Sequence, residues 1–356
     1  MGDNMTLSLC MIVKNEEINL DRLLNQVNTL FDEIIIVDTG STDNTKNVAL
    51  KYTNLVFDFT WINDFSKARN YSLSKASMDY IMWLDADDFI LDENIIKIKE
   101  LKNNLDFDIA LFKYNTGYDK EFSNYTLSYY RERIFINNNR YFFIDPIHEY
   151  IPLIGNIKYL DISIEHYKLE STDPLRNLKI YEELESKNHI FTPRQLYYYA
   201  RELFDNKKYK KSIEFLKKFI KTKKGWIEDE INSCILLYKA YANLNKTDFG
   251  VKYLYESFNY DIRAEAIYEI GNFFYNKKEY EKAIYFYRQI FNFKLDKYKG
   301  FVFKDVYNFY PLIMISLCNF ELNKIKKAIY YNDLAKLYKP NSEIVINNDK
   351  FFKSLI

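Results

Sequence analysis

The sequence is short of the residues that mark several classes of protein. Its three cysteines (Cys10, Cys234 and Cys318) are scattered in apolar segments, which excludes a disulfide framework and a cysteine-ligated zinc site. No run approaches the roughly 20 apolar residues of a membrane span. Lys+Arg and Asp+Glu both number 50, so the chain lacks the positive excess typical of nucleic-acid binders. The N-terminus has no basic segment of the signal-peptide kind, and we expect a cytoplasmic protein.

The balanced charge hides a difference between the two halves of the chain. Residues 1–170 carry 17 basic and 27 acidic residues, whereas residues 171–356 carry 33 and 23. With 356 residues, of which 48% are apolar, the chain is long enough for two domains with sizeable cores. We therefore predict a first domain over 1–170, a linker with a helix over 171–189, and a second domain over 190–356.

Residues 1–170 alternate between strand-like and helix-like patterns. The predicted strands are 6–13, 33–37, 55–59 and 80–84, and the predicted helices are 18–30, 41–52 and 65–76. This alternation predicts parallel βαβ units, in which ligands bind at the carboxyl ends of the strands. After residue 104 the pattern changes to antiparallel-looking strands, at 109–114, 126–136, 141–144 and 157–164.

Residues 190–342 contain a recurring helix-pair template. In the unit around Gly271, an aromatic residue (Phe274) follows after three positions and an alanine (Ala283) after twelve, which is the tetratricopeptide spacing. Looser copies surround Ser212, Val251 and Ala328, and the series Ser212, Val251, Ala283, Ala328 has spacings of 39, 32 and 45. We predict four degenerate repeats in a short helical solenoid, the alternative being an ordinary helical bundle.

Four ordered motifs in the first half resemble a known family. MIVKNEE, EIIIVDTGSTDNT, WINDFSKARNYSL and WLDADD are similar to family-2 glycosyltransferases of the α/β GT-A fold, with its Rossmann-like nucleotide-sugar-binding domain. IHE at 147–149, HYK at 166–168 and the repeats resemble the sublancin-type peptide glycosyltransferases. The resemblance implies an inverting hexosyltransferase, a UDP-sugar donor (UDP-glucose or UDP-N-acetylglucosamine) and a divalent cation (Mn²⁺ or Mg²⁺).

Two aspartates after the strand at 80–84 suit that cation. A departing nucleoside diphosphate develops negative charge, which a hard cation held by carboxylate oxygens stabilises. Asp85 and Asp87, at i and i+2 of an extended segment, are expected to point the same way. We expect Asp87 to contact the metal and Asp85 to bind the donor ribose or reach the metal through water, the alternative being a solvated turn. Asp88 suits a cap, and by resemblance His166 completes the metal site.

Other polar residues resemble the donor-binding positions of the family. By resemblance Asp38 accepts hydrogen bonds from uracil or ribose, although it also suits a helix cap. Arg69 is expected to offset diphosphate charge and Asn70 to bond donor hydroxyls. For Lys67 an exposed helix face is the alternative. The remaining expected contacts are Asn15, Glu16 (alternatively a helix N-terminal charge), Asp64, and Arg133 with Arg131 (alternatively a cross-strand ion pair).

An inverting transfer also needs a base that takes the proton of the attacking acceptor. Glu149 is the first candidate and Asp145 the second, whereas His148 is a candidate for positioning the diphosphate. His189, in the polar segment between the two halves, suggests no functional role.

Three functions remain open at this stage. The first is transfer of a hexose or N-acetylhexosamine to a Ser, Thr or Cys side chain of a peptide or protein presented by the repeats, whose basic, aromatic-rich groove suits an acidic or aromatic peptide. The second is transfer to a glycan or lipid-linked saccharide, with the repeats used for homodimerisation. The third, from another class, is a non-catalytic repeat scaffold with a degenerate sugar-binding domain.

Overall fold

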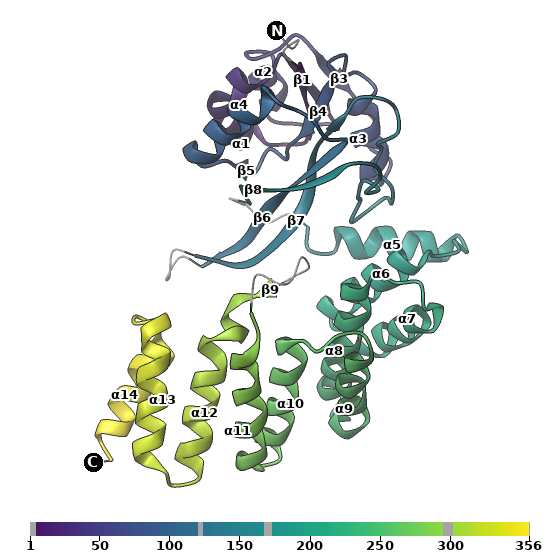
Figure 1. The fold of residues 1–356 in the computed structure, drawn as a ribbon. Coiled ribbons are helices and arrows are strands. Elements are labelled where there is room, and N and C mark those ends of the chain that lie inside the picture. The colour runs from purple at the N-terminus through teal and green to yellow at the C-terminus, as the bar shows by residue number, and fades with distance from the viewer. Residues whose placement is uncertain (1–4, 120–123, 167–172, 295–301, 356) are drawn as a thin grey trace. The chain divides into compact units, whose positions relative to one another are not determined.

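The computed structural model describes residues 5–119, 124–166, 173–294 and 302–355, which form two compact units (Figure 1). The first unit contains residues 1–118 and 128–174, and the second contains residues 119–127 and 175–356. Helix α5 (Arg176–Ser186) occupies most of the segment predicted as a linker. The first unit is an α/β structure that carries the candidate site, and the second consists of helix pairs.

A mixed sheet forms the centre of the first unit, with strand order β3-β2-β1-β4-β7-β6-β8-β5. Its strands are β1 (Leu7–Val13), β2 (Glu33–Asp38), β3 (Val56–Asp58), β4 (Tyr80–Trp83), β5 (Asp88–Phe89), β6 (Ile109–Asp119), β7 (Asn124–Ile136) and β8 (Ile157–His166). Strand β1 runs parallel to β2 and β4, and β2 runs parallel to β3, which confirms the predicted parallel units. The carboxyl ends of these four strands therefore meet at one edge.

The later strands differ from the prediction in direction. Strand β7 is antiparallel to β4, as expected, but β6 and β8 are parallel to each other. The predicted strand at 141–144 is absent from the described residues, and only Ile144 forms a backbone bridge, with Tyr150. Alternation of apolar residues marks a strand but carries no information on its partner or direction, and so it could not show this crossover.

Four helices accompany the sheet: α1 (Glu17–Val27, followed by the short helix η1, Asn28–Leu30), α2 (Thr45–Ala49), α3 (Phe65–Leu73) and α4 (Asp92–Lys102). Ile18, at the start of the predicted apolar helix 18–30, is 68% exposed. Helix α2 starts later than predicted, because the backbone N–H groups of Gly40 and Ser41 donate to Asp38 in a turn that precedes the helix. Helix α4 was not predicted.

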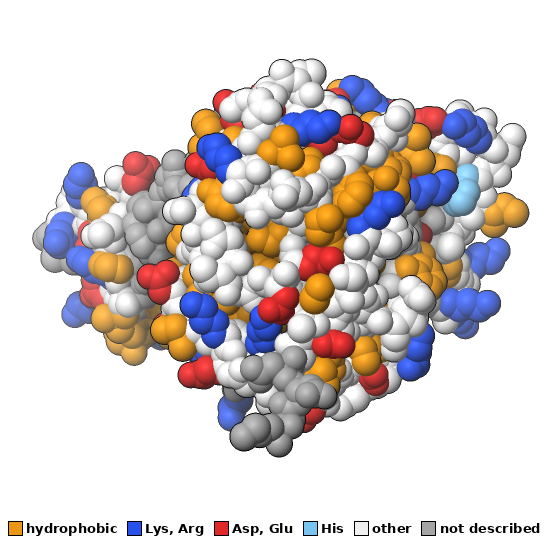
Figure 2. Space-filling view, turned by 90° about the horizontal axis from the view of Figure 1, so that it is seen from above, with side chains coloured by type: hydrophobic (Ala, Val, Ile, Leu, Met, Phe, Trp, Pro, Cys, Tyr) orange, Lys and Arg blue, Asp and Glu red, His pale blue; other side chains and the backbone are white. Residues whose placement is uncertain are grey.

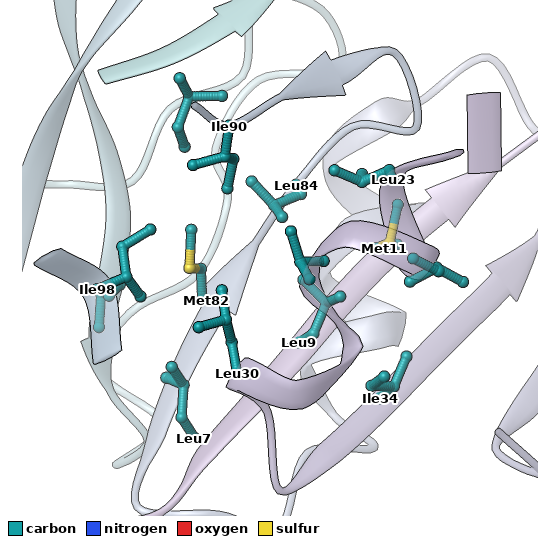
Figure 3. Packing of buried hydrophobic residues seen from close by; sticks show 14 of the residues in the cluster. Leu7, Leu9, Met11, Leu23, Leu30, Ile34, Met82, Leu84, Ile90 and Ile98 are labelled. Atoms are coloured by element: carbon teal, nitrogen blue, oxygen red, sulfur yellow. The ribbon is translucent and has the colours of Figure 1, made fainter. Parts of the chain in front are cut away.

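An apolar cluster on one face of the sheet holds the first unit together (Figure 3). Leu9 and Met11 of β1 share this cluster with Leu23 of α1 and Ile98 of α4, and all four are 1% exposed or less. Cys10, between the two β1 residues, belongs to a second cluster on the other face. Strands buried on both faces are typical of parallel sheets covered by helices, and this burial fixes their register.

Helix pairs build the second unit, and four of them coincide with the four predicted repeats. The pairs are α6 (Pro193–Asp205) with α7 (Tyr209–Thr222), α8 (Ile227–Asn243) with α9 (Thr247–Glu256), α10 (Ala264–Asn276) with α11 (Tyr280–Gln289), and α12 (Phe309–Glu321) with α13 (Ile325–Tyr338). Helix α14 (Glu343–Lys353), three short helices η2 (Ser257–Asn259), η3 (Ile290–Asn292) and η5 (Lys304–Tyr307), and strand β9 (Val302–Phe303) complete the described elements.

The repeats share the conformation of their turn. Within each pair, one left-handed residue with φ between 56° and 61° lies in the turn; these are Lys207, Asn245, Lys278 and Asn323. At the template glycine, Gly271, a methyl group would overlap the ring of Tyr287 on the paired helix. The small residue of the template is therefore needed for the approach of α10 to α11.

The described helices include none long and apolar enough to cross a membrane. On the face shown in Figure 2, lysine and arginine side chains are interspersed with acidic and hydrophobic ones. The three cysteines are free and buried, in line with the prediction of no disulfide framework.

Candidate active site

The carboxyl edge of the parallel strands brings several predicted site residues together. Asp38 ends β2 and lies in register with Val13, the last residue of β1. Asp85 follows β4, the other neighbour of β1. Because parallel strands end on the same side, the sequence motifs that follow β1, β2 and β4 converge there.

Asp38, one of the predicted donor contacts, is buried, at 4% exposed. Its Oδ1 accepts hydrogen bonds from the backbone of Gly40 and Ser41, each at 2.8 Å. Its Oδ2 is buried and has no hydrogen-bond partner among the described residues. A buried carboxylate oxygen without a donor is costly, and so this atom is a ready acceptor for a ligand N–H or O–H group.

Asn15 and Glu16 shape the loop that follows β2. Asn15, at φ 55°, accepts a hydrogen bond from the backbone of Thr42 at 2.7 Å, and its own N–H donates to Ser41. The Glu16 side chain accepts a hydrogen bond from Asn19 at 2.7 Å. Both predicted donor contacts therefore lie at the expected edge, where Asn15 holds the loop that follows β2 and Glu16 bonds the first turn of α1.

A buried arginine links two carboxylates at the centre of the site. Arg69 donates from Nη2 to Asp85 at 2.7 Å and from Nε to Glu149 Oε1 at 2.8 Å, and it is 6% exposed. Burial alone would raise the pKa of Asp85, but the charges of Arg69, Arg131 and Arg133 outweigh it and hold this pKa well below its usual range.

Three guanidinium groups surround the indole ring of Trp83. The central carbons of Arg69, Arg131 and Arg133 lie 4.5, 4.5 and 4.1 Å from its centroid. Arg131 also approaches Glu149 Oε1 at 3.5 Å. Arg133 is 0% exposed and donates to Asp88 at 2.9 Å. It therefore supports the acidic turn and has no exposed surface with which to contact a nucleotide sugar.

The acidic turn after β4 departs from the predicted extended pair. The backbone N–H of Asp88 donates to the carbonyl of Asp85 at 3.1 Å, which closes a turn at residues 86–87. As a result Asp85 binds Arg69, whereas Asp87 lies beside His166 and does not share a direction with Asp85.

Asp87, Asp88 and His166 offer ligand atoms within 4.8 Å of one another. Strand β5 pairs with β8 so that Asp88 is opposite His166. Asp88 is fully buried, and both of its oxygens accept hydrogen bonds, from Tyr114 at one and from Arg133 at the other. It is therefore no simple cap. Burial, with the nearby charge of Asp85, raises the pKa of Asp87 to about 6.

The loop at 145–149 is pinned to the start of α3. The carbonyl of Pro146 accepts a hydrogen bond from Phe65 at 2.8 Å, and the Asn70 amide bonds both backbone groups of Phe143. Asp145 and His148 have φ of 76° and 53°, a strained conformation for residues other than glycine.

The predicted WINDFSKARN residues thus divide into two kinds. Asp64 caps α3 by accepting from the Lys67 backbone at 3.0 Å, and Asn70 holds the neighbouring loop, so both have structural partners. The Lys67 side chain is exposed, and Arg69 is the buried cation of the site.

In the second unit, His189 bonds Gln195 at 2.9 Å within the α6 capping box, in keeping with its structural interpretation.

Sequence reasoning missed two residues of the site, Trp83 and Tyr114. Trp83 is the platform for three arginines, and the Tyr114 hydroxyl lies 2.9 Å from both Asp88 and His166. No local motif marks Tyr114, which is one of 33 tyrosines. The signal available for Trp83 was its place immediately before the acidic turn.

The fold and the acidic edge define a GT-A-like α/β domain followed by tetratricopeptide-like repeats. Residues 8–157 match the sequence model of the family "Glycosyl transferase family 2". These residues therefore form a family-2 glycosyltransferase domain, which confirms the resemblance predicted from the four motifs.

Individual proteins are similar to larger or smaller parts of the chain. The glycosyltransferase SunS of Bacillus subtilis is 29% identical over 260 residues, which cover 66% of this chain and 58% of SunS. A TPR repeat-containing protein of Synechococcus elongatus is 40% identical over 105 residues, or 30% of this chain and 25% of that protein. The chain thus spans little more than half the length of SunS. The crystal structure of S. aureus TarS 1-349 with UDP-GlcNAc is 17% identical, with a TM-score of 0.39, and covers 69% of this chain and 89% of that one.

Replacing the central arginine tests the electrostatics of the site. Arg69→Met leaves Asp85 and Glu149 without their shared cation and should lower the free energy of unfolding by about 3–5 kcal/mol at pH 7. Because the pKa of Asp85 is lowered in the folded state, this stabilisation is present above the usual Asp pKa of 3.8 and is lost as the pH falls below it. Denaturant unfolding at pH 7 and at pH 3 measures both effects.

The matched control is Arg140→Met, which removes an exposed arginine from the same unit. It should change the free energy of unfolding by no more than about 0.5 kcal/mol. Equal losses for the two variants would contradict a special role of the Arg69 cluster.

Proposed function

We propose that the protein is a metal-dependent inverting glycosyltransferase that moves a hexose or N-acetylhexosamine from a UDP-sugar to a Ser, Thr or Cys side chain of a peptide or protein. UDP-glucose and UDP-N-acetylglucosamine are the proposed donors. The observation that carries the proposal is the cluster of Asp87, Asp88 and His166 at the carboxyl edge of a family-2 domain. We assign catalysis to residues 1–170, acceptor binding to the repeats at 190–356, and a cytoplasmic setting that suits three free cysteines.

The residues present fit a divalent cation. Asp88 has both oxygens engaged, so Asp87 and His166, with side chains 21% and 28% exposed, are the groups that would hold it. Carboxylate and imidazole are ligands that Mn²⁺ accepts, and Mg²⁺ binds through carboxylates and substrate phosphates. When bound, the cation supplies Lewis-acid stabilisation of the diphosphate leaving group.

Other residues of the chain would orient and bind the donor. Asp38 Oδ2 is the proposed acceptor for an N–H of uracil or a hydroxyl of ribose, because it is buried and lacks a partner. Asp85 is the proposed indirect contact, through ribose or water, since Arg69 already binds one of its oxygens. Arg69 and Arg131 add positive charge beside the site, which favours the diphosphate.

Removing the proposed metal carboxylate tests the donor half of the proposal. Asp87→Asn keeps the size of the side chain but lacks its charge, so Mn²⁺ binding by calorimetry and Mn²⁺-dependent hydrolysis of UDP-sugars should both be lost, without a change in thermal unfolding. Asp161→Asn removes an exposed carboxylate of the same unit and should leave both unchanged. Full hydrolysis by Asp87→Asn in EDTA would contradict metal dependence.

Glu149 is the proposed base, with Asp145 as the second candidate. Its contacts with Arg69 and Arg131 both engage Oε1, and Oε2 takes part in neither. Glu149 belongs to the same loop as Asp145 and His148, whose strained backbone suits residues held for a task. We propose that Oε2 takes the acceptor proton and that His148 positions the diphosphate.

Glu149→Gln separates proton transfer from binding. Glutamine retains an oxygen for the arginines but cannot take a proton, so sugar transfer should fall by at least about 10²-fold while donor affinity by calorimetry is kept. Asp145→Asn, measured in parallel, should reduce transfer less. Near-normal transfer by Glu149→Gln together with loss in Asp145→Asn would move the base to Asp145.

A pocket of about 360 Å³ in the second unit supports acceptor binding by the repeats. Side chains of α8 and α10 form most of its lining, including Asn243, Asn276 and Tyr275. Lys239 and Glu269, also in the lining, pair at 2.9 Å. The lining is thus polar and aromatic with paired charges, and the basic groove expected from composition is not found in this pocket. Amide side chains both donate and accept, which suits an extended peptide backbone.

The double variant Asn243→Ala/Asn276→Ala tests this pocket. Both asparagines are exposed, so their removal should leave the fold intact, raise the KM for a peptide acceptor found by screening Ser-, Thr- and Cys-containing peptides, and leave UDP-sugar hydrolysis unchanged. Asn292→Ala, an exposed asparagine outside the pocket lining, is the control. An unchanged KM would contradict acceptor binding by this pocket and would favour dimerisation as the role of the repeats.

A further inference from the structure

We propose that Tyr114 is a positioning residue that holds His166 in the tautomer protonated at Nδ1, so that Nε2 presents its lone pair to a divalent cation. Only one part of the inference, the presentation of Nε2 to a cation, rests on the metal site of the proposed function. The other part, the tautomer of His166, follows from hydrogen bonds among residues of this chain. Tyr114 belongs to β6, and none of the sequence motifs includes it.

The Tyr114 hydroxyl has two partners and a single hydrogen. It lies 2.9 Å from Asp88 Oδ1 and 2.9 Å from His166 Nδ1. A phenol can donate only one hydrogen bond, while its oxygen can accept others. One partner must therefore receive the hydrogen and the other must supply one.

Asp88 is the partner that receives it. Its Oδ2 accepts from Arg133 Nη1 at 2.9 Å and from the backbone N–H of Asp85 at 3.0 Å, as a carboxylate does. A guanidinium group and a backbone N–H can only donate, so Asp88 serves as the acceptor in both of these bonds. The Tyr114 hydrogen therefore points to Asp88 Oδ1.

The hydrogen on the other side then comes from His166. With its own hydrogen committed, the Tyr114 oxygen can only accept, so His166 Nδ1 must carry the proton that it donates. In a neutral imidazole the second nitrogen, Nε2, is then unprotonated and available as a ligand. A hydrogen bond to one ring nitrogen commonly fixes the metal-binding nitrogen in this way.

The surroundings leave Tyr114 no second position. It is 4% exposed, its ring has an edge contact with Tyr129 at 5.7 Å, and Arg133 lies over it at 4.7 Å. The pairing of β5 with β8 fixes Asp88 opposite His166. The hydroxyl is thus held between two groups that the sheet itself aligns.

Asp87 would compete for His166 if Tyr114 lacked its hydroxyl. Asp87 Oδ1 is 3.6 Å from His166 Nδ1, too far for a hydrogen bond in this structure but near enough to become one after a small shift. That bond would occupy an oxygen proposed for the metal and draw the two ligands together. By bonding Nδ1, Tyr114 occupies the His166 nitrogen that this competing bond would use.

The experiment compares the wild-type protein with Tyr114→Phe, which retains the ring and removes only the hydroxyl. In ¹⁵N-histidine-labelled, metal-free protein at pH 8, long-range ¹H–¹⁵N spectra report the tautomer of His166, assigned with His166→Gln. We expect Nδ1–H in the wild-type protein and a shift towards Nε2–H in Tyr114→Phe. Mn²⁺ affinity by calorimetry should fall by about 10- to 100-fold.

Tyr80→Phe is the matched control. Tyr80 is another buried tyrosine of the same unit, and its hydroxyl bonds the carbonyls of Leu105 and Phe107, away from the acidic turn. It should lose comparable stability, with the His166 tautomer and Mn²⁺ affinity unchanged. Equal effects of the two variants on Mn²⁺ affinity would overturn the positioning role and leave only a structural one.

The experiment distinguishes failure of the Tyr114 inference from failure of the proposed metal site. An Nε2–H signal in the wild-type protein overturns the inference whatever the protein binds, and it needs no folded variant. Mn²⁺ binding by the wild-type protein that survives in Tyr114→Phe also overturns it, but leaves the proposed metal site standing. Absence of Mn²⁺ binding with an Nδ1–H signal overturns the metal half and the proposed function's cation, and keeps the tautomer assignment.

Discussion

Charge compensation around Trp83 is the constraint on which the rest of the candidate site depends. Asp85, Asp88 and Glu149 are drawn close together by the strand ends and the loop at 145–149. Their mutual repulsion is offset by three arginines that contact the same indole ring, two of which are at least 94% buried. The weakly hydrated, planar guanidinium group stacks on an aromatic face, so it tolerates burial that an ammonium group would not.

This arrangement is incomplete in its hydrogen bonds. Nε and Nη2 of Arg133 are buried without a partner among the described residues, and its ring contacts with Trp83 and Tyr114 compensate them only in part. Asp38 Oδ2 is likewise buried without a partner among the described residues. Buried hydrogen-bond donors and acceptors that lack partners lower stability. Their presence beside one edge of a sheet is typical of a functional site.

The sequence determined the parallel half of the fold well, because its signals are local. Apolar runs such as Ile34–Val37 end in turn residues, and the strand–helix alternation leaves few possible connections. The repeats were equally accessible, since Ala283 and its counterparts Ser212, Val251 and Ala328 recur along the chain. The direction of β8 and the loop at 145–149 depend on contacts between distant segments, and no local pattern encodes them.

The residues of the site were predicted better than their contacts. Asp87 and His166 lie together as expected, but the turn at Asp85–Asp88 assigns each aspartate a different partner. An i, i+2 rule for extended chains failed there because one backbone hydrogen bond reverses the local direction. Asn70 lies at the predicted edge, but its amide bonds the backbone of Phe143. Tyr114 had no sequence signal at all.

The pairing of β5 with β8 has a consequence for biosynthesis. Asp87 and Asp88 are translated well before His166, and the whole β6–β7 segment separates them along the chain. While the first unit is emerging from the ribosome, its acidic turn has neither the imidazole nor the arginines of β7 beside it. The cluster of Asp87, Asp88 and His166 is therefore assembled only when β8 joins the sheet, and a nascent chain that stops short of β8 carries the two carboxylates without the imidazole.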